Sequence, residues 1–185
     1  MALTRRQILM VKKETSYGVS PSTAGTDALL VLNPQLTPLD GDLLEREIID
    51  SSFGRVRSRI IAMRKMGLQF DVEAAGSGTA GTAPKYDPLL LACGFNATVV
   101  SSTSVTYAPI STTPDSCELY HNWDGNKHAG LGARGTFDLA FEAGQIPRFS
   151  FTMQGIYQAP TDVAFPSPSY SCLLYTSDAA DEEDS

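Results

Sequence analysis

Alternation of apolar and polar residues is the strongest pattern along the chain. Leu68, Phe70 and Val72 alternate with polar residues, and the same pattern recurs over residues 136–142 and 148–157. A period of two places successive side chains on opposite faces of a strand, so one face can be buried while the other contacts water. Such half-polar strands are typical of antiparallel sheets, because the strands of parallel sheets are buried on both faces.

Turn residues between these runs predict two hairpins. Residues 143–147, Ala-Gly-Gln-Ile-Pro, join the last two alternating runs. Asp124-Gly125 predicts a second hairpin that pairs residues 117–123 with a strand beginning near Lys127, because Asp-Gly tolerates the positive φ of a tight turn. Residues 5–11 and 43–49 are weaker strand candidates.

One short helix is predicted after residue 86. Asp87 can cap it, Pro88 suits its first position, the apolar residues 89–93 follow, and Gly94 can end it. A single short helix beside many strands predicts a mainly β fold, an antiparallel β-sandwich or barrel with one short flanking α-helix.

Three segments lack a regular pattern. Residues 14–41 are rich in Ser, Thr, Gly and Pro, and we expect a long extended arm there. Residues 51–66 form a basic, partly apolar stretch, which we expect to be a loop. Residues 166–171 resemble a Pro/Ser linker, so the β domain is predicted to span residues 1–165.

Length and composition fit one domain with a real core. The chain has 185 residues, of which 42% are hydrophobic. No run of 18 apolar residues exists, which excludes a membrane-spanning helix, and the N-terminus lacks the features of a secretory signal. Cys93, Cys117 and Cys172 share no close spacing, which argues against a disulfide framework or a cysteine metal site.

The acidity of the chain is concentrated at its C-terminus. The net charge is −7, but residues 172–185 hold five acids and no base, which leaves 16 acids and 14 bases, a net charge of −2, in residues 1–171. Residues 172–182 resemble the translated read-through of a sequencing adapter. We therefore expect residues 172–185 to be an artefactual or disordered tail that contributes nothing to function.

A glycine motif at residues 76–81 suggests one enzymatic alternative. Gly76, Gly78 and Gly81 form a literal GxGxxG, which in dinucleotide sites brings backbone N–H groups and a helix N-terminus onto a pyrophosphate. The preceding strand alternates, however, and residues 97–114 contain no acid to bind a ribose. A flexible loop is favoured, with a nucleotide-binding enzyme as the weaker alternative.

The two histidines suggest a metal or an acid–base pair. His121 and His128 flank Asp124, and imidazole and carboxylate are metal ligands. A hairpin turn accounts for Asp124 without chemistry, and no third soft ligand has suitable spacing. The chain also lacks a GxSxG motif. We therefore expect no catalytic residue, no metal and no cofactor, and the chain is predicted not to be an enzyme.

A cluster of bases has three interpretations. Five bases lie within eleven residues and are mixed with the apolar Ile60 and Ile61: Arg55, Arg57, Arg59, Arg64 and Lys65. The segment could be a solvated loop, a nucleic-acid site, or a contact loop in which the arginines meet carboxylates of a neighbouring subunit. The acidic run with Glu45 and Glu47 would be a natural partner in the third case.

Several segments, read in order, resemble the bacteriophage tail tube proteins. They are Lys-Lys-Glu-Thr-Ser-Tyr-Gly at 12–18, Ala-Pro-Lys-Tyr-Asp-Pro-Leu-Leu at 83–90, Ala-Cys-Gly-Phe at 92–95, Tyr-Ala-Pro at 107–109, Leu-Tyr-His-Asn at 119–122 before Asp-Gly at 124–125, Gly-Ala-Arg-Gly-Thr at 132–136, and Phe-Thr-Met-Gln-Gly-Ile-Tyr at 151–157. The resemblance covers roughly residues 10–165 and lies in the order and spacing of the segments.

This resemblance implies a structural role. Such proteins are similar in fold to type VI secretion tube proteins, and they form hexameric or pseudo-hexameric rings that stack into a tube through which DNA passes without specific binding. We expect a virion protein that is assembled in the bacterial cytoplasm with other tail proteins and makes no membrane contact. Another virion structural or adhesion module is the alternative. The resemblance and the charge pattern suggest a subunit interface that includes Tyr17, Glu45, Glu47, Arg55, Arg57, Arg59, Ile60, Ile61, Arg64 and Lys65.

Overall fold

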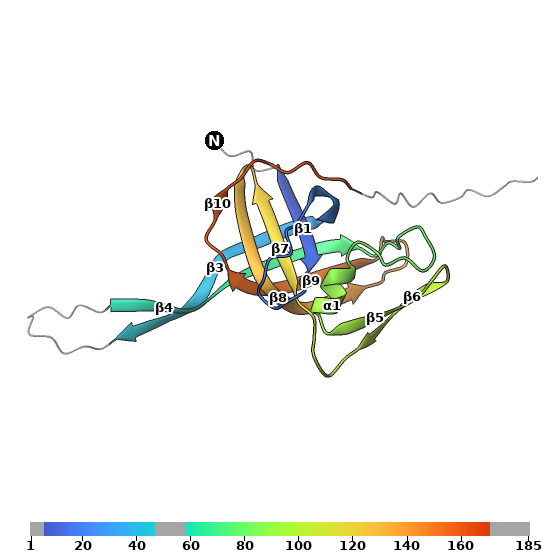
Figure 1. Ribbon diagram of the computed structural model, residues 1–185, viewed down its shortest axis with the longest axis horizontal. Coiled ribbons are helices and arrows are strands. Elements are labelled where there is room, and N and C mark those ends of the chain that lie inside the picture. The colour runs from blue at the N-terminus through green and yellow to red at the C-terminus, as the bar shows by residue number, and fades with distance from the viewer. Residues whose placement is uncertain (1–5, 47–57, 171–185) are drawn as a thin grey trace, which may run out of the picture.

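The computed structural model describes residues 6–46 and 58–170, and it is dominated by one antiparallel sheet (Figure 1). The strand order of this sheet is β2-β1-β7-β8-β9-β4-β3, with β10 paired to β8, and β5 and β6 form a separate two-stranded sheet. The elements are β1 (Gln7–Lys13), the 3₁₀ helix η1 (Gly25–Asp27), β2 (Ala28–Leu29), β3 (Leu32–Arg46), β4 (Ser58–Glu73), α1 (Asp87–Ala92), β5 (Phe95–Val100), β6 (Ser104–Pro109), β7 (Cys117–Trp123), β8 (Asn126–Ala140), β9 (Arg148–Tyr157) and β10 (Thr161–Asp162).

The large sheet curls back on itself around a single main core. β2 and β3 lie at opposite ends of the strand order, yet only residues 30–31 separate them along the chain. Side chains from every strand of this order meet inside, and α1 adds two leucines and one alanine to the same cluster: Leu89, Leu90 and Ala92. The helix is therefore part of the core, as an apolar helix of six residues must be to remain folded.

The alternating patterns predicted the strands of this core correctly. In β4, Leu68, Phe70 and Val72 are buried while their neighbours are exposed or half-buried, and β9 alternates in the same way around Phe151 and Met153. Both predicted hairpins are confirmed, because β8 pairs with β9 and β7 pairs with β8 across the Asp124-Gly125 turn. The mainly β fold class is therefore confirmed.

The predicted helix forms, with a different N-terminal cap. Tyr86 is the N-cap residue and makes no side-chain capping bond, while Asp87 is already helical. The Asp87 carboxylate instead accepts a hydrogen bond of 2.6 Å from the Tyr107 hydroxyl, which ties α1 to β6. Gly94 has a φ of 87° directly after the helix, as expected for a glycine that ends it.

The arm and the loop expected at residues 14–41 and 51–66 need correction. Residues 32–41 are extended, but they belong to β3 and pair with β4 within the same chain. Residues 58–66 are not a loop, because they form the first part of β4. Glycine and proline in the first segment, and bases in the second, concealed a hairpin whose strands pair over most of their length.

The outer face of β1 and β7 is covered by the C-terminal segment. Ile8, Met10 and Tyr120 form a second, smaller cluster against which Phe165 packs. Ser169 donates a backbone hydrogen bond of 2.9 Å to Gly25. The described part of the Pro/Ser segment therefore lies against the domain, while a linker role for residues 166–171 and the predicted nature of residues 172–185 remain predictions.

A buried carboxylate fastens the loop after β1. Glu14 accepts hydrogen bonds from the Ser116 hydroxyl at 2.7 Å and from the backbone N–H groups of Gly18 at 2.9 Å and Gly132 at 2.7 Å. These bonds connect residues 12–18 with residues 132–136, two of the segments that resemble tail tube proteins. Both segments therefore contribute to the stability of the fold. A buried carboxylate is tolerated here because three donors replace the water it has lost.

A buried histidine lies on the inner face of β7. His121 is 2% exposed, and burial, followed by the nearby His128, lowers the pKa of His121 to about 4. Its Nε2 lies 3.3 Å from Gln7 Oε1, and its Nδ1 has no partner among the described residues. The imidazole is therefore neutral in the folded protein at neutral pH.

We expect Glu14→Gln to destabilise the domain by about 3 kcal/mol, because the amide group turns an NH₂ donor toward donors that are already buried. Urea unfolding at pH 7.5 measures the loss. Glu142→Gln, at an exposed position in the β8–β9 connection, is the matched control and should change the stability little. An equally small effect at Glu14 would show that the carboxylate does not fasten the loop.

We expect the stability to fall as the pH is lowered from about 6.5 to about 4, because the unfolded chain binds a proton at His121 in this window and the folded chain does not. The full shift corresponds to about 3 kcal/mol. His121→Gln removes this proton uptake but keeps the acid sensitivity of the carboxylates. Parallel stability–pH curves for the two proteins in this window would refute the assignment.

Candidate subunit interface

The outer half of the β3–β4 hairpin extends away from the rest of the molecule. Between Lys65 and Asp71, β4 pairs with both β3 and β9, whereas residues 58–62 pair with β3 alone. Figure 1 shows this part projecting to the left of the sheet. We call residues 42–46 and 58–63 the distal hairpin. A two-stranded ribbon without further contacts is only marginally stable in water, so this segment needs a partner.

Large apolar side chains are exposed along the distal hairpin. The exposed fractions are 58% for Leu43, 55% for Leu44, 47% for Ile60, 36% for Ile61 and 81% for Met63. Soluble monomers seldom gather exposed apolar residues in one place, and such patches mark interaction sites. The distal hairpin therefore has the composition of a protein interface.

The backbone is irregular where the distal hairpin leaves the body. The β3–β4 register shifts between Thr37 and Asp40 and again between Asp40 and Asp42. At Gly41 an added Cβ would lie 2.9 Å from both the Ala62 carbonyl oxygen and the Ile61 side chain. Met63 has a φ of 49°, which is rare for a residue with a side chain. Bulges bend and twist a strand, and here they set the direction of the distal hairpin.

Two ion pairs connect β3 and β4 within the chain. Arg59 lies 2.9 Å from Glu45, its direct cross-strand partner, and Lys65 lies 3.6 Å from Asp40. The described arginine that pairs with Glu45 belongs to the same hairpin, and pairing of Glu45 with an arginine of a neighbouring subunit stays a prediction. Both pairs are exposed, so each contributes little to stability.

The remaining predicted interface residues lie in three different places. Arg64 is exposed on β4 just before Lys65. Glu47, Arg55 and Arg57 lie outside the described residues, so their role stays a prediction. Tyr17 lies on the body, where its ring covers Gly132 and the Arg134 guanidinium sits 5.0 Å from the ring centroid. Glu45, Arg59, Ile60 and Ile61 lie together in the hairpin, whereas Tyr17 belongs to a different surface. A role of these residues in an interface remains a prediction.

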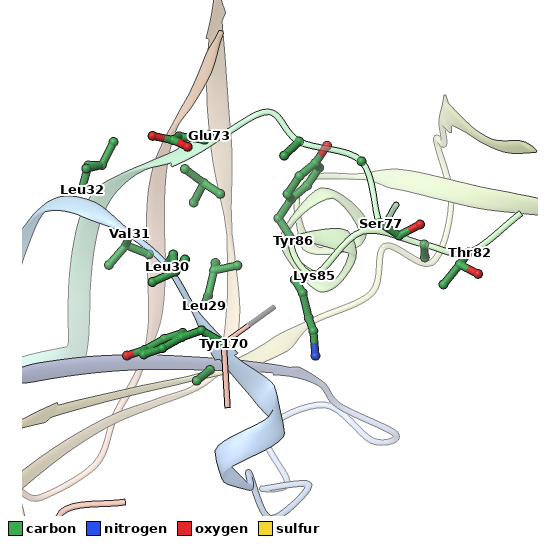
Figure 2. A pocket seen from close by; sticks show the side chains of 15 residues that line it. Leu29, Leu30, Val31, Leu32, Glu73, Ser77, Thr82, Lys85, Tyr86 and Tyr170 are labelled. Carbon is green, nitrogen blue, oxygen red and sulfur yellow. The ribbon is translucent and has the colours of Figure 1, made fainter. Parts of the chain in front are cut away.

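The glycine motif lines an apolar cavity near the other end of β4. The cavity has a volume of about 410 Å³ and is bounded by residues 28–32, the end of β4 and the loop before α1 (Figure 2). Lys85 at its edge donates a hydrogen bond of 2.9 Å to the Thr26 carbonyl. An added Cβ at Gly81 would collide with the backbone of Val100 and Ser102, so close packing against the β5–β6 turn accounts for this glycine.

The histidine pair forms no metal cluster in the described part of the chain. His121 and His128 are direct cross-strand partners in β7 and β8, as the hairpin prediction implied. Within residues 6–46 and 58–170, no group of three or more His, Cys, Asp or Glu side chains could hold a metal ion. The helix described is also too short to cross a membrane.

Sequence reasoning predicted a weak strand at residues 43–49, of which 43–46 belong to β3, but it missed the pairing of this strand with β4, although a signal was present. Leu43-Leu44 and Ile60-Ile61 are apolar doublets, and adjacent residues of a strand point to opposite faces. Such doublets break the one-sided alternation by which the other strands were found. They indicate a ribbon that is apolar on both faces.

Comparisons with known proteins agree with this architecture. Residues 4–182 match the family model of the phage tail tube protein. In fold, the chain is similar to a chain in the cryo-EM structure of an extracellular contractile injection system, the PVC sheath–tube complex in its extended state, with a TM-score of 0.53 and 8% identity over 88% of this chain and 93% of that one. It is also similar to a chain in the tail of an empty GTA particle refined with C6 symmetry, with a TM-score of 0.44 and 10% identity over 84% and 96% of the two chains. A search of curated sequences found no match.

The family match covers nearly the whole chain and includes the exposed hairpin and the curled sheet that carries it. The chain belongs to the phage tail tube protein family, and it is a structural subunit of a phage tail tube.

Proposed function

We propose that this chain closes with copies of itself into hexameric rings, or into pseudo-hexameric rings if each chain carries two such domains, and that the distal hairpin makes a main contact between subunits. The stacked rings form the tail channel for DNA, with assembly in the bacterial cytoplasm alongside other tail proteins. One observation carries the proposal: five large apolar side chains are exposed on a ribbon that pairs with no third strand within residues 6–46 and 58–170.

The hairpin suits a contact between subunits better than the two alternatives. A solvated loop would not gather leucine and isoleucine side chains. Leaving each of them in water is less favourable than burying it fully by about 1.5–3 kcal/mol. A nucleic-acid site would keep its bases available, whereas Arg59 and Lys65 already face carboxylates of the same chain. Burial against another subunit uses both the apolar side chains and the paired charges around them.

The overall charge is compatible with DNA that passes without binding. Residues 1–171 carry 16 acids and 14 bases, so the subunit has no excess of positive charge. Phosphate contacts with Lys and Arg dominate the affinity of proteins for DNA, and a channel rich in such contacts would retain the genome. We infer that DNA contacts in the lumen are transient and independent of sequence.

No catalytic role is part of this proposal. Burial raises the pKa of the Cys93 thiol to about 11 and raises that of Cys117 as well, which disfavours the nucleophilic thiolate. The nucleotide-binding alternative at residues 76–81 can be tested separately by calorimetry with NAD and ATP. A virion adhesion module would share the fold but would not form long tubes.

We expect purified protein at high concentration to form tubes that are visible by negative-stain electron microscopy. Met63→Lys should remain folded, because Met63 is already exposed, but should fail to form tubes, since a charge would be buried at the contact. Met63→Leu keeps an apolar side chain at the same backbone position and is the matched control. Tubes from Met63→Lys at the wild-type concentration would remove the hairpin from the interface.

We expect Arg59→Glu to weaken tube formation, because it places a carboxylate opposite Glu45 and splays the strands of the hairpin. The exchanged variant Glu45→Arg with Arg59→Glu restores an ion pair within the hairpin and should restore tubes. Sedimentation of assembled material measures both effects. If the exchanged variant does not recover tube formation, Arg59 pairs with a carboxylate of a neighbouring subunit instead.

A further inference from the structure

We propose that the distal hairpin is held between two different copies of the chain, one against each of its faces. This inference rests on the proposed function, because it assumes that copies of the chain assemble through the hairpin. It adds that a single hairpin joins three chains: its own and one on either side.

The cross-strand register assigns the exposed side chains to two faces. Leu43 pairs directly with Ile61, and Leu44 pairs directly with Ile60. Directly paired residues of an antiparallel ribbon lie on the same face, and the next pair lies on the opposite face. Leu43 and Ile61 therefore form one apolar face, and Leu44 and Ile60 form the other.

The two faces are similarly exposed in the single chain. The average exposed fraction is 47% for Leu43 and Ile61, from 58% and 36%, and 51% for Leu44 and Ile60, from 55% and 47%. A ribbon that lay with one side on a single surface would have a polar outer face, as the other strands of this protein have. Covering only one face would leave half of the apolar side chains in water.

A single copy could cover both faces only with a deep slot. Sheets pack about 10 Å apart face to face, so a layer of protein on each side of the ribbon requires an opening of about 20 Å. Two cavities among the described residues, of about 410 and 500 Å³, are each smaller than a slot of that width holding a two-stranded ribbon. The surfaces of two copies can enclose the ribbon without such a slot.

A second copy of the chain is the occupant that the observations favour on each face. Tail tube proteins act as multi-copy assemblies, so every subunit meets the same surfaces repeatedly. The described charges of the hairpin are nearly balanced and partly paired, which disfavours a strongly charged partner such as nucleic acid. Apolar faces flanked by paired charges match the core-and-rim composition of interfaces between proteins.

Enclosure of one hairpin by two copies makes assembly of the tube cooperative. If two copies enclose one hairpin, a chain that meets only one neighbour leaves one apolar face in water. Its contact is then weaker than the contact in a finished tube, so assembly becomes cooperative. A hairpin that is marginal on its own would order fully only when both neighbours are present.

Photo-cross-linking can count the copies that touch one hairpin. In a Cys93→Ser, Cys172→Ser background, Leu43→Cys with Ile60→Cys carries benzophenone-maleimide on opposite faces, and Leu43→Cys with Ile61→Cys carries both labels on one face. Each labelled chain is assembled with a large excess of unlabelled wild-type chain. Co-sedimentation with tubes establishes that the labelled chain has been incorporated, and a denaturing gel resolves the products after irradiation.

We expect cross-linked trimers from the opposite-face protein and mainly dimers from the same-face protein. Equal yields of trimer from the two incorporated proteins would overturn the inference. Absence of tubes from unlabelled wild-type protein would instead refute the proposed function, so the two failures are distinct.

A second measurement covers the case in which the label prevents incorporation. In the same background, unlabelled Leu43→Cys and Leu44→Cys differ only in the face that carries the thiol. We expect both thiols to react with maleimide about tenfold or more slowly in tubes than in dissociated subunits, because both faces are covered. Protection of only one of the two positions would show that the hairpin lies on a single neighbour.

Discussion

The continuous pairing of β3 with β4 is the constraint on which the rest of the structure depends. Near residues 32 and 71 the two strands belong to the curled sheet, where Leu68 and Phe70 are buried in the core. The same two strands continue outward to the apolar pairs of the distal hairpin. Because the inner half is fixed by β9 and the core, the outer half is presented in a defined direction, and the bulges around Gly41 adjust that direction locally. The core thus stabilises the inner half of the two strands, and this half holds the outer half in place.

The fold could be predicted from the sequence wherever a strand has one buried face. The alternation around Phe70 and Phe151 identified β4 and β9, and Asp124-Gly125 identified a turn in which both residues adopt positive φ. The same rule failed for the distal hairpin, because its strands carry apolar residues on both faces and therefore lack a one-sided alternation. The five bases from Arg55 to Lys65 drew attention to charge, whereas the structure shows that the apolar doublets 43–44 and 60–61 are exposed on both faces of a ribbon.

The recognisable segments of the sequence are held together by structural contacts. Glu14 from the first segment is bonded to Gly132 from a later one, and the Tyr17 ring lies over the same glycine. A side chain at residue 132 would collide with that ring, and its φ of 59° further favours glycine. Spacing alone could not predict this joint, since residues 14 and 132 meet only after β1, β7 and β8 have paired. The resemblance to tail tube proteins therefore marked the frame of the fold, and none of the resembling segments lies in the distal hairpin.

Exposed ribbons carry a risk that this architecture limits. Two apolar faces with unpaired strand edges invite non-specific aggregation of free subunits. Charged residues accompany the apolar pairs: Arg59 and Glu45 form an exposed ion pair beside them, and charges along a strand edge disfavour non-specific pairing with other strands. A contact that is weak for one neighbour and strong for two would also keep free subunits apart until a growing end offers both surfaces. The same residues can then serve solubility before assembly and cohesion after it.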